Sequence, residues 1–414
     1  MSPVADAGSP ATRAGSPRTG ERREAAPARA GPGVFLAIVL LSLNLRTIVS
    51  SLPPLLAEVR GELGLSAVAA GLLTTLPVLC FGALAPLAPR LARRVPIERL
   101  LVACGLLTAA AAALRGAGGA APLFAGSVLA GVAIALAQAV LPVLIRTRYA
   151  AQAGPLTGAF SMALTLGAAV AAGAAVPLER LLGDSWEASL AAWAVPAALA
   201  TVLWLPAALG PGTVVRGAPP PALLRQPLAW SVSLFFGMQS LTFYAGLAWL
   251  PSVLADAGYE AGEAGSLLAL GNLLQIAPAF VLPILAARRP DQAGLMVAVV
   301  LLSVAAPVGL LAAPGAAPLW MVLLGLGQGG ALGLALILPV LRGGDAATVA
   351  SLTAMALCVG YLVAANGPWL LGAVHDASGG WSVALVLLTA LTALELVPGL
   401  AASRRRTLTP ARSP

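Results

Sequence analysis

The sequence has few charged or aromatic residues and no lysine at all. Of 414 residues, 10% are charged and 5% are aromatic, against 59% hydrophobic, and there is one histidine, His375. A soluble protein carries about 25% charged residues, so this chain cannot cover a water-exposed surface. With one histidine and no lysine, the usual nucleophile–base pairs of an enzyme lack members. These shortages exclude a soluble enzyme and a nucleic-acid-binding domain.

Cysteine is also scarce. The three cysteines, Cys80, Cys104 and Cys358, all lie inside apolar runs and lack the spacing of a metal site or a disulfide framework. We interpret them as small buried hydrophobic side chains. The sequence therefore predicts no metal, no cofactor and no disulfide-stapled secreted domain.

What the chain has instead is long apolar runs, and its mean hydropathy is +0.92. A spanning helix needs about 20 mostly apolar residues, and twelve runs meet that need. They cover 33–56, 67–89, 99–115, 121–145, 155–178, 188–209, 228–251, 263–287, 293–312, 317–341, 348–373 and 381–402. Pro77, Pro86, Pro142, Pro278, Pro283 and Pro339 lie within these runs and predict bends. We predict an all-α integral membrane protein with twelve transmembrane helices in a lipid bilayer.

The arginines are concentrated in alternate loops. If the N-terminus is internal, twenty arginines lie in internal segments and three, Arg60, Arg115 and Arg180, in external loops. Positively charged residues remain on the cytoplasmic side of a membrane. We therefore expect a multi-pass protein of the plasma membrane with both termini in the cytoplasm.

The runs divide into two sets of six. The loop between the sixth and seventh contains Gly210-Pro211-Gly212 and Pro219-Pro220-Pro221, and similar segments recur across it. Leu52-Pro53 matches Leu250-Pro251, and Leu141-Pro142-Val143-Leu144 matches Leu338-Pro339-Val340-Leu341. Such matches in order indicate an internal repeat. The predicted parts are a disordered tail (1–32), two six-helix bundles (33–209 and 228–402), a linker (210–227) and a C-terminal tail (403–414).

Arg46 is the most informative residue, because it lies near the middle of the first run. An arginine at the centre of a bilayer costs at least about 2.5 kcal/mol, so it is expected to face a water-filled cavity or a partner. We interpret it as the cation that binds an anion at the bottom of a central cavity. The alternatives are a structural role, with bonds to backbone carbonyls, or a side chain that reaches an interface.

Other polar side chains lie in the runs. Uncharged amides both donate and accept hydrogen bonds, which suits a small polar substrate, although amides also serve to join helices. Aromatic residues of the seventh run either line the cavity or pack in the core. With Arg46, the predicted substrate-binding residues are Asn44, Gln138, Gln239, Tyr244, Trp249, Asn272, Gln275, Gln328, Tyr361 and Asn366.

One acidic residue, Glu395, lies within a run, and we expect a structural or boundary role for it. His375 and Asp376 are expected in the last external loop. No run pairs two carboxylates or a carboxylate with a histidine, so the sequence shows no proton pathway. Whether a proton or another ion is coupled to movement of a substrate stays open, as does the direction of movement.

Several strings resemble the cyanate transporter and 2-nitroimidazole exporter branch of the major facilitator superfamily. These are Asn44-Leu45-Arg46, Ala70 to Val78, Gln138 to Pro142, Gly237 to Tyr244 with Trp249-Leu250-Pro251, Gly325 to Gly329, Gly360-Tyr361, Gly367-Pro368 and His375-Asp376. The chain departs from the branch at Thr47, where proline is usual, and at Leu357, where glutamine is usual.

The resemblance implies two six-helix halves with a substrate site between them, opened to either side in turn. It also implies a small polar or anionic substrate, cyanate being one candidate, and a monomer. The alternative is efflux of small hydrophobic or nitroheterocyclic compounds by the same fold, with the aromatic residues dominant.

Overall fold

A computed structural model describes residues 30–210, 212–214, 223–404 and 406–408. The described chain is helical, and no strand occurs in those ranges. The predicted N-terminal tail lies almost wholly outside the described residues, as does most of the C-terminal tail.

Each of the twelve predicted runs coincides with one helix or with consecutive helices. The first half contains α1 (Pro32–Ser50), η1 (Pro53–Leu55), α2 (Leu56–Leu63), α3 (Ala67–Leu84), α4 (Leu87–Ala92), α5 (Ile97–Arg115), α6 (Ala120–Arg148), η2 (Ala150–Gln152), α7 (Ala153–Leu181), α8 (Trp186–Ala192) and α9 (Ala194–Leu209). The second half contains α10 (Pro227–Asp256), α11 (Ala261–Leu274), α12 (Ile276–Ala287), α13 (Ala293–Ala312), η3 (Pro314–Ala316), α14 (Ala317–Arg342), α15 (Ala346–Ala364), α16 (Asn366–Ser378), α17 (Trp381–Leu394) and α18 (Leu396–Ser403).

Eleven helical segments of the described chain are long and apolar enough to cross a membrane. The predicted run that does not reach this hydropathy is α10, although its 30 residues extend over about 45 Å at 1.5 Å per residue. Its hydropathy is lowered by polar side chains such as Gln239, Thr242 and Tyr244. The low mean hydropathy of α10 therefore reflects several polar side chains within one long helix.

Four breaks inside the spans have one physical cause. Helices end at Ala192, Leu274, Ala364 and Leu394, and a proline follows four residues later each time, at Pro196, Pro278, Pro368 and Pro398. Proline has no N–H, so the carbonyl four residues before it loses its helical partner. Of the six prolines expected to bend helices, Pro86 and Pro278 lie at breaks, whereas Pro77, Pro142, Pro283 and Pro339 lie inside continuous helices.

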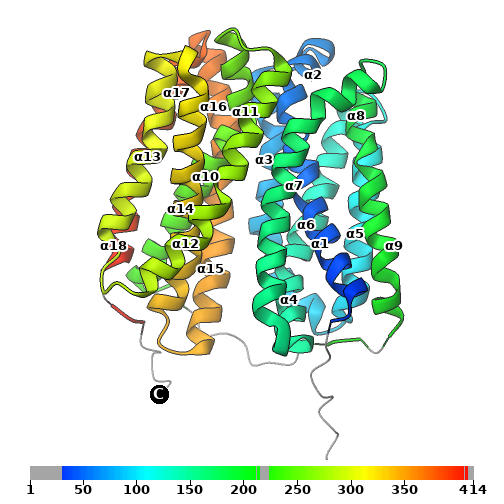
Figure 1. Ribbon diagram of the computed structural model, residues 1–414, viewed down its shortest axis with the longest axis vertical. Helices are drawn as coiled ribbons and strands as arrows, with labels where there is room; N and C mark the ends of the chain where they lie inside the picture. The colour runs from blue at the N-terminus through cyan, green and yellow to red at the C-terminus, as the bar shows by residue number, and fades with distance from the viewer. Residues whose placement is uncertain (1–29, 211, 215–222, 405, 409–414) are drawn as a thin grey trace, which may run out of the picture.

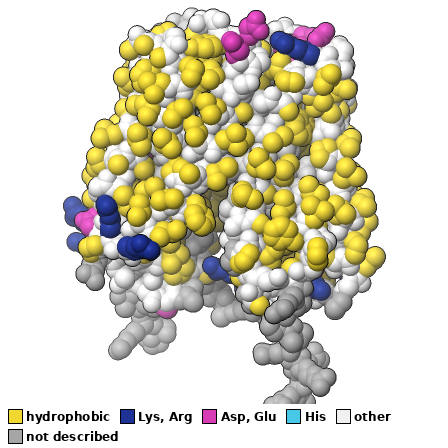
Figure 2. Space-filling view, viewed as in Figure 1, with side chains coloured by type: hydrophobic (Ala, Val, Ile, Leu, Met, Phe, Trp, Pro, Cys, Tyr) yellow, Lys and Arg dark blue, Asp and Glu magenta, His cyan; other side chains and the backbone are white. Residues whose placement is uncertain are grey.

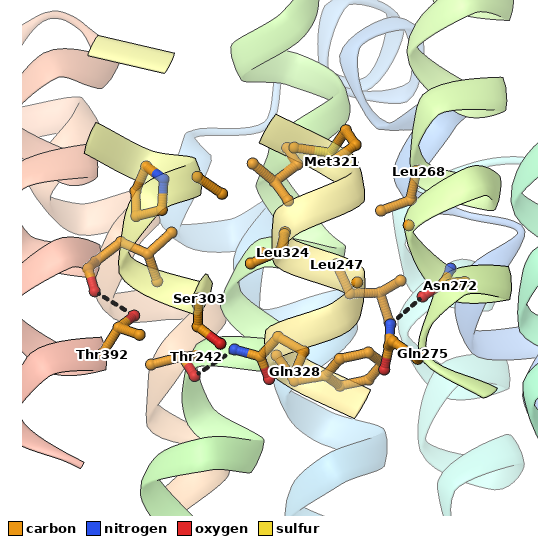
Figure 3. A pocket seen from close by; sticks show the side chains of 18 residues that line it. Thr242, Leu247, Leu268, Asn272, Gln275, Ser303, Met321, Leu324, Gln328 and Thr392 are labelled. Carbon is orange, nitrogen blue, oxygen red and sulfur yellow. Dashed lines mark hydrogen bonds between the residues drawn. The ribbon is translucent and has the colours of Figure 1, made fainter. Parts of the chain in front are cut away.

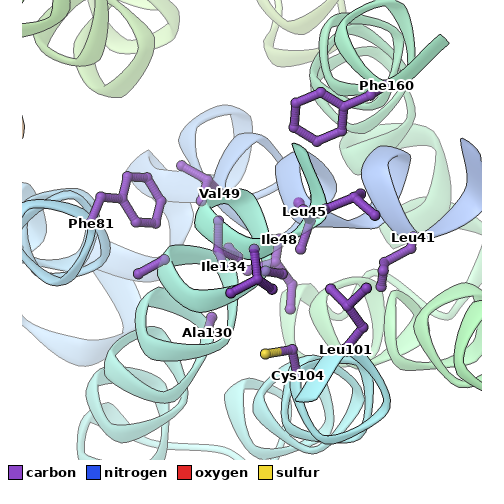
Figure 4. Packing of buried hydrophobic residues seen from close by; sticks show 14 of the residues in the cluster. Leu41, Leu45, Ile48, Val49, Phe81, Leu101, Cys104, Ala130, Ile134 and Phe160 are labelled. Carbon is purple, nitrogen blue, oxygen red and sulfur yellow. The ribbon is translucent and has the colours of Figure 1, made fainter. Parts of the chain in front are cut away.

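The first half has its own apolar core (Figure 4). Leu41, Leu45 and Ile48 form one stripe of α1, and each is at most 2% exposed. Residues three or four apart share a helix face, and this stripe packs with Leu101 of α5 and Ile134 of α6 in one cluster. Burial of this stripe determines which side of α1 is left for Arg46.

The outer surface is apolar over most of its height (Figure 2). Large hydrophobic side chains remain exposed within the spans, among them Phe280 at 69%, Leu301 at 62% and Val195 at 61%. Charged side chains in this view lie mainly near the two ends of the molecule. An apolar belt between charged ends is the surface expected of a protein surrounded by lipid tails.

The two halves stand side by side, with the start of α1 and the end of α18 at the lower end in Figure 1. We call that end the terminal face and the opposite end the loop face. Toward the loop face α7 packs on α11, and α3 packs on α15 and α16. The approach is close: a Cβ at Gly71 would lie 2.7 Å from the Pro368 carbonyl oxygen, and one at Gly265 would lie 2.8 Å from that of Ala172. Glycine is what permits such backbone contact.

A carboxylate also joins the halves at the loop face. The side chain of Asp376, on α16, accepts hydrogen bonds from the backbone N–H groups of Ala67 (3.1 Å) and Val68 (3.0 Å) at the start of α3. Arg60 of α2 lies 3.9 Å from the same carboxylate. A negative charge at a helix N-terminus is favourable, so this contact stabilises the closed loop face. Toward the terminal face, Figure 2 shows a hollow between the halves.

Candidate functional site

Arg46 leaves α1 toward the other half of the molecule. Its neighbours Leu45 and Ile48 enter the core of the first half, so the intervening arginine has to emerge on a different side of the helix. The helix ends at Ser50, shortly before Pro53 and Pro54, which cannot donate to a helical carbonyl. Arg46 is therefore held on the last turns of a helix that stops inside the span.

The guanidinium of Arg46 meets α10 at the junction of the halves. Its Nη1 donates a 2.8 Å hydrogen bond to the hydroxyl oxygen of Tyr244. Its central carbon lies 5.7 Å from the ring centre of Tyr244 and 6.0 Å from that of Phe243. The two bonded residues are 198 positions apart, the same offset as between Leu52-Pro53 and Leu250-Pro251. Arg46 and Tyr244 thus occupy matching positions of the two repeats.

Aromatic rings from both halves surround this contact. Phe81 of α3 lies 5.4 Å from Tyr361 of α15 and 6.4 Å from Tyr244, measured between ring centres. Phe243 and Phe236 pack edge-on against Tyr244 and Tyr361 respectively. Flat faces and edges at 5–6 Å are favourable packing for aromatic rings. The same surfaces can receive a small planar solute.

The group of polar atoms at Arg46 is rich in donors and poor in acceptors. Arg46 retains partly accessible surface, and no carboxylate of the described chain lies within 4.0 Å of it. Within the same ranges, the hydroxyl hydrogens of Tyr244 and Tyr361 have no acceptor. A cation with adjacent O–H donors and no counter-charge favours an anion or a strongly accepting neutral group.

A second polar group lies inside the second half, around a pocket between α10, α11, α13, α14 and α17 (Figure 3). Gln239 donates to Gln328 (3.1 Å), and Gln328 donates to the Thr242 hydroxyl (3.0 Å). On the opposite wall Gln275 donates to Asn272 (3.0 Å), whose own amide nitrogen is buried without a partner. The free volume is 30 Å³, room for about two waters.

The predicted site residues therefore fall into separate places. Arg46, Tyr244 and Tyr361 meet at the junction of the halves. Gln239, Asn272, Gln275 and Gln328 belong to the pocket of the second half and to its hydrogen-bonded wall. Gln138 stands on α6, with its amide nitrogen buried and unpaired.

Three more predicted residues lie elsewhere. Asn44 is two positions away on α1 and so points to another side, where its amide donates to the carbonyls of Leu40 and Pro196. The Trp249 ring nitrogen donates to the Pro368 carbonyl (2.6 Å) within the contact near the loop face. Asn366 is exposed and donates to the carbonyls of Leu362 and Val363, at the break before α16.

The sequence reasoning missed two residues. Phe81 joins the aromatic group through a contact between halves for which the sequence carries no signal. Arg115, which the charge pattern assigns to an external loop, is the last residue of α5 and is 2% exposed. Its guanidinium donates to the Ile48 carbonyl, near the end of α1. Arg115 thus satisfies a backbone carbonyl in the last turn of α1, where the helix ends at Ser50.

The chain is similar in sequence to several known proteins. A family described as Major Facilitator Superfamily matches residues 34–365. The 2-nitroimidazole transporter of Escherichia coli (strain K12) is 38% identical over 377 residues, which is 90% of this chain and 95% of that protein. The cyanate transport protein of the same organism is 33% identical over 353 residues, covering 84% of this chain and 91% of that protein.

Solved structures share the architecture at low sequence identity. A bacterial homologue of the human lysosomal transporter Spinster, in an inward-facing and occupied conformation, has a TM-score of 0.76 at 16% identity, over 91% of this chain and 98% of its own. A D-xylose–proton symporter has a TM-score of 0.69 at 16% identity, over 91% and 99%. These likenesses show the fold.

Proposed function

The chain belongs to the major facilitator superfamily, and from that premise we propose that it is a secondary transporter of a small polar or anionic solute. Arg46 is the anchor for the negative end of the solute, and the surrounding rings hold its flat body. The observation that carries the proposal is the donor-rich contact of Arg46 with Tyr244 at the junction of the halves, with no carboxylate of the described residues within 4.0 Å of the guanidinium.

The chemistry of this contact suits both kinds of solute. A guanidinium forms its strongest hydrogen bonds with charged or strongly polarised oxygen and nitrogen acceptors. Cyanate offers such atoms at its ends, and a nitro group offers two oxygens in one plane. The relatives named for cyanate and for 2-nitroimidazole make these two compounds the first to test.

Alternating access is the proposed mechanism. The halves pack closely toward the loop face and leave a hollow toward the terminal face. A solute bound at Arg46 touches both halves, so rocking one half against the other moves the opening from one side to the other. Arg46 and Tyr244 belong to different halves, so their hydrogen bond is a contact that such a motion has to break or re-form.

We place the terminal face in the cytoplasm and the protein in the plasma membrane. Alternate segments rich in arginine support this orientation. The path lies within one chain, so the monomer is the proposed unit of transport. The direction of net movement follows from the gradients across the membrane.

A second candidate is efflux of small hydrophobic or nitroheterocyclic compounds. The observation in its favour is the aromatic group of Phe81, Phe243, Tyr244 and Tyr361, which can bind a ring without help from a cation. The two candidates differ in their dependence on Arg46: anchoring by charge requires the arginine, whereas binding by rings does not.

Purified protein in proteoliposomes tests the proposal with radiolabelled 2-nitroimidazole and cyanate. Hydrogen bonds to a charged group are worth about 1.5–3 kcal/mol, so Arg46→Gln is expected to weaken binding of the transported compound by about tenfold to 150-fold. Arg288→Gln removes an exposed arginine at the terminal face and is the matched control, with transport unchanged.

Three outcomes separate the candidates. Loss of transport in Arg46→Gln with a correctly folded protein supports the anchor. Transport of nitroheterocycles that survives this substitution favours efflux without an anchor. Failure of the unaltered protein to bind or move either compound would contradict the proposed substrate class.

A further inference from the structure

Glu395 is a carboxylic acid buried inside the second half. It stands between α17 and α18, where the helix is interrupted because Pro398 cannot donate to the Leu394 carbonyl. The residue is 0% exposed.

Neither carboxyl oxygen of Glu395 makes a hydrogen bond to the described part of the chain. No arginine or histidine of these ranges lies within 4.0 Å of it. The Thr242 hydroxyl, on α10, faces this carboxyl group. An ionised carboxylate without water, partner or counter-charge costs many kcal/mol, and a buried group avoids that cost by taking up a proton. In this conformation Glu395 is therefore the neutral acid.

Glu98 provides the contrast within the same molecule. Its side chain is also 0% exposed, yet it accepts hydrogen bonds from Arg148 and from both the backbone N–H (2.8 Å) and the hydroxyl (2.7 Å) of Thr213. A carboxylate with this many donors stays ionised because they replace its water. The two buried acids thus have opposite surroundings.

The surroundings of Glu395 contain no fixed charge to compensate it. The helices packed against α17 and α18 are α10, α13 and α16. The helix α13 has no titratable side chain, and neither do α17 and α18. The helix α10 contributes Tyr244 and Asp256, and α16 contributes His375 and Asp376. Arg342 of α14 reaches the far end of α18, where it donates to the carbonyls of Ala402 and Ser403.

Glu395 is connected to the substrate contact through α10. On α17, Leu388 and Thr392 line the pocket of the second half, and Glu395 continues their face by one turn. Thr242, which faces the acid, accepts from Gln328 and donates to the Gln239 carbonyl (3.0 Å). Two residues further along the same helix, Tyr244 holds Arg46. A change in the protonation of Glu395 therefore affects α10, the helix that carries the proposed solute contact.

We infer that Glu395 is a proton-binding site through which this transporter couples proton movement to that of its solute. The inference rests on the proposed function. In the described conformation the acid holds one proton. When the conformation changes and water enters the pocket, the O–H bond breaks, the proton passes to water, and the carboxylate remains until it is protonated again from either side.

Transport with and without a pH gradient tests the coupling. In proteoliposomes, accumulation of 2-nitroimidazole is expected to depend on the gradient, and Glu395→Gln, which keeps the neutral shape, should abolish that dependence. Exchange of labelled for unlabelled 2-nitroimidazole at equal pH should stay within about threefold, because exchange does not require the proton to leave. Asp184→Asn removes an exposed carboxylate and is the matched control, with coupling intact.

Labelling provides a readout independent of transport. Dicyclohexylcarbodiimide reacts with protonated carboxyls in apolar surroundings, so mass spectrometry of the unaltered protein should find the adduct on Glu395 and none on Glu98. Absence of label on Glu395, or transport that ignores the gradient in the unaltered protein, would overturn the inference. The second result would leave the proposed function standing, whereas absence of any transport would contradict that function and not the labelling.

Discussion

At the scale of single residues, three charged side chains inside the molecule have different hydrogen-bond partners. Among the described residues, Arg115 donates to the Ile48 carbonyl, Glu98 accepts from Arg148 and Thr213, and Arg46 donates to the Tyr244 hydroxyl. The first two are tied to neighbouring backbone or to a counter-charge. Arg46 alone of these three keeps partly accessible surface, which is why we assign the solute to it.

The hydroxyl of Tyr244 leads to a prediction at this scale. Tyr244→Phe keeps the ring and its packing but removes the acceptor for Arg46 and a donor for the solute. One such hydrogen bond is worth about 0.5–1.5 kcal/mol, so affinity for the transported compound should fall by about twofold to tenfold, as measured by calorimetry on purified protein. The melting temperature should stay close to that of the unaltered protein. Unchanged affinity would remove the hydroxyl from the site.

At the scale of helices, proline explains much of the architecture. The breaks before Pro196, Pro278, Pro368 and Pro398 divide four long spans into two helices each. Two of these breaks hold polar side chains, Gln275 and Glu395, at the point where the helix is interrupted. Unpaired backbone inside a membrane requires nearby polar groups or water, and these two residues add to the polar interior that Gln239, Asn272 and Gln328 form.

The start of α3 leads to a prediction at this scale. Asp376→Asn keeps the size of the side chain but removes the negative charge that faces the helix N-terminus. A surface charge at a helix N-terminus is worth about 0.3–1 kcal/mol, so the population of the closed loop face should fall by about twofold to fivefold. Spin labels at Asp184→Cys and Asp256→Cys, in a chain without its native cysteines, should report longer distances.

Asp376→Glu retains the charge and is the control for this experiment, with distances near those of the parent chain. The two labelled positions are exposed near the loop face, on different halves. A distance distribution that is the same with Asn and with Asp at position 376 would mean that the backbone contacts near Gly71 and Gly265 hold the face closed without help.

At the scale of the whole molecule, the apolar belt fixes the position of the protein in a membrane. Leu301 lies in the middle of α13 and is 62% exposed, whereas Leu209 is the last residue of α9 and is 85% exposed. Arginine at the centre of a span costs about 3–4 kcal/mol more than leucine. Leu301→Arg should therefore strongly reduce the membrane-integrated fraction after expression, and Leu209→Arg should leave it unchanged. Equal integration of both variants would contradict the proposed depth of α13.

The sequence predicts the helices well because hydropathy is a local property. Each of the twelve apolar runs is helical, and the arrangement of two halves agrees with the superfamily. The four helix breaks could also have been predicted from the prolines that follow them, but equally apolar helices continue through Pro142 and Pro339. Local sequence does not decide between the two, because neighbouring helices determine whether an unpaired carbonyl is tolerated.

The candidate site is harder to predict, since it depends on which helix faces meet. Arg46 was identified by its cost in a bilayer, and Tyr244 by its place on the most polar span. Phe81 and Tyr361, 280 positions apart in the sequence, come together only through the packing of α3 on α15. Asn44 has the right chemistry but lies on the wrong side of α1, and Asn366 lies on the outside. The positions of polar residues in the sequence do not show which helix faces meet.

The segment between the halves is anchored on each side. Thr213 is fixed by Glu98 and by its carbonyl's bond to the Ile97 N–H (3.0 Å), and Leu223 is 7% exposed in the core of the second half. From residue 214 to residue 223 there are nine peptide steps, which reach at most about 32 Å when stretched. The connection is thus a linker of limited length whose two ends are fixed to the two halves. When the terminal face opens, the distance between residues 214 and 223 cannot exceed the length of the stretched linker. The covalent chain therefore sets an upper limit on how far the halves can separate there.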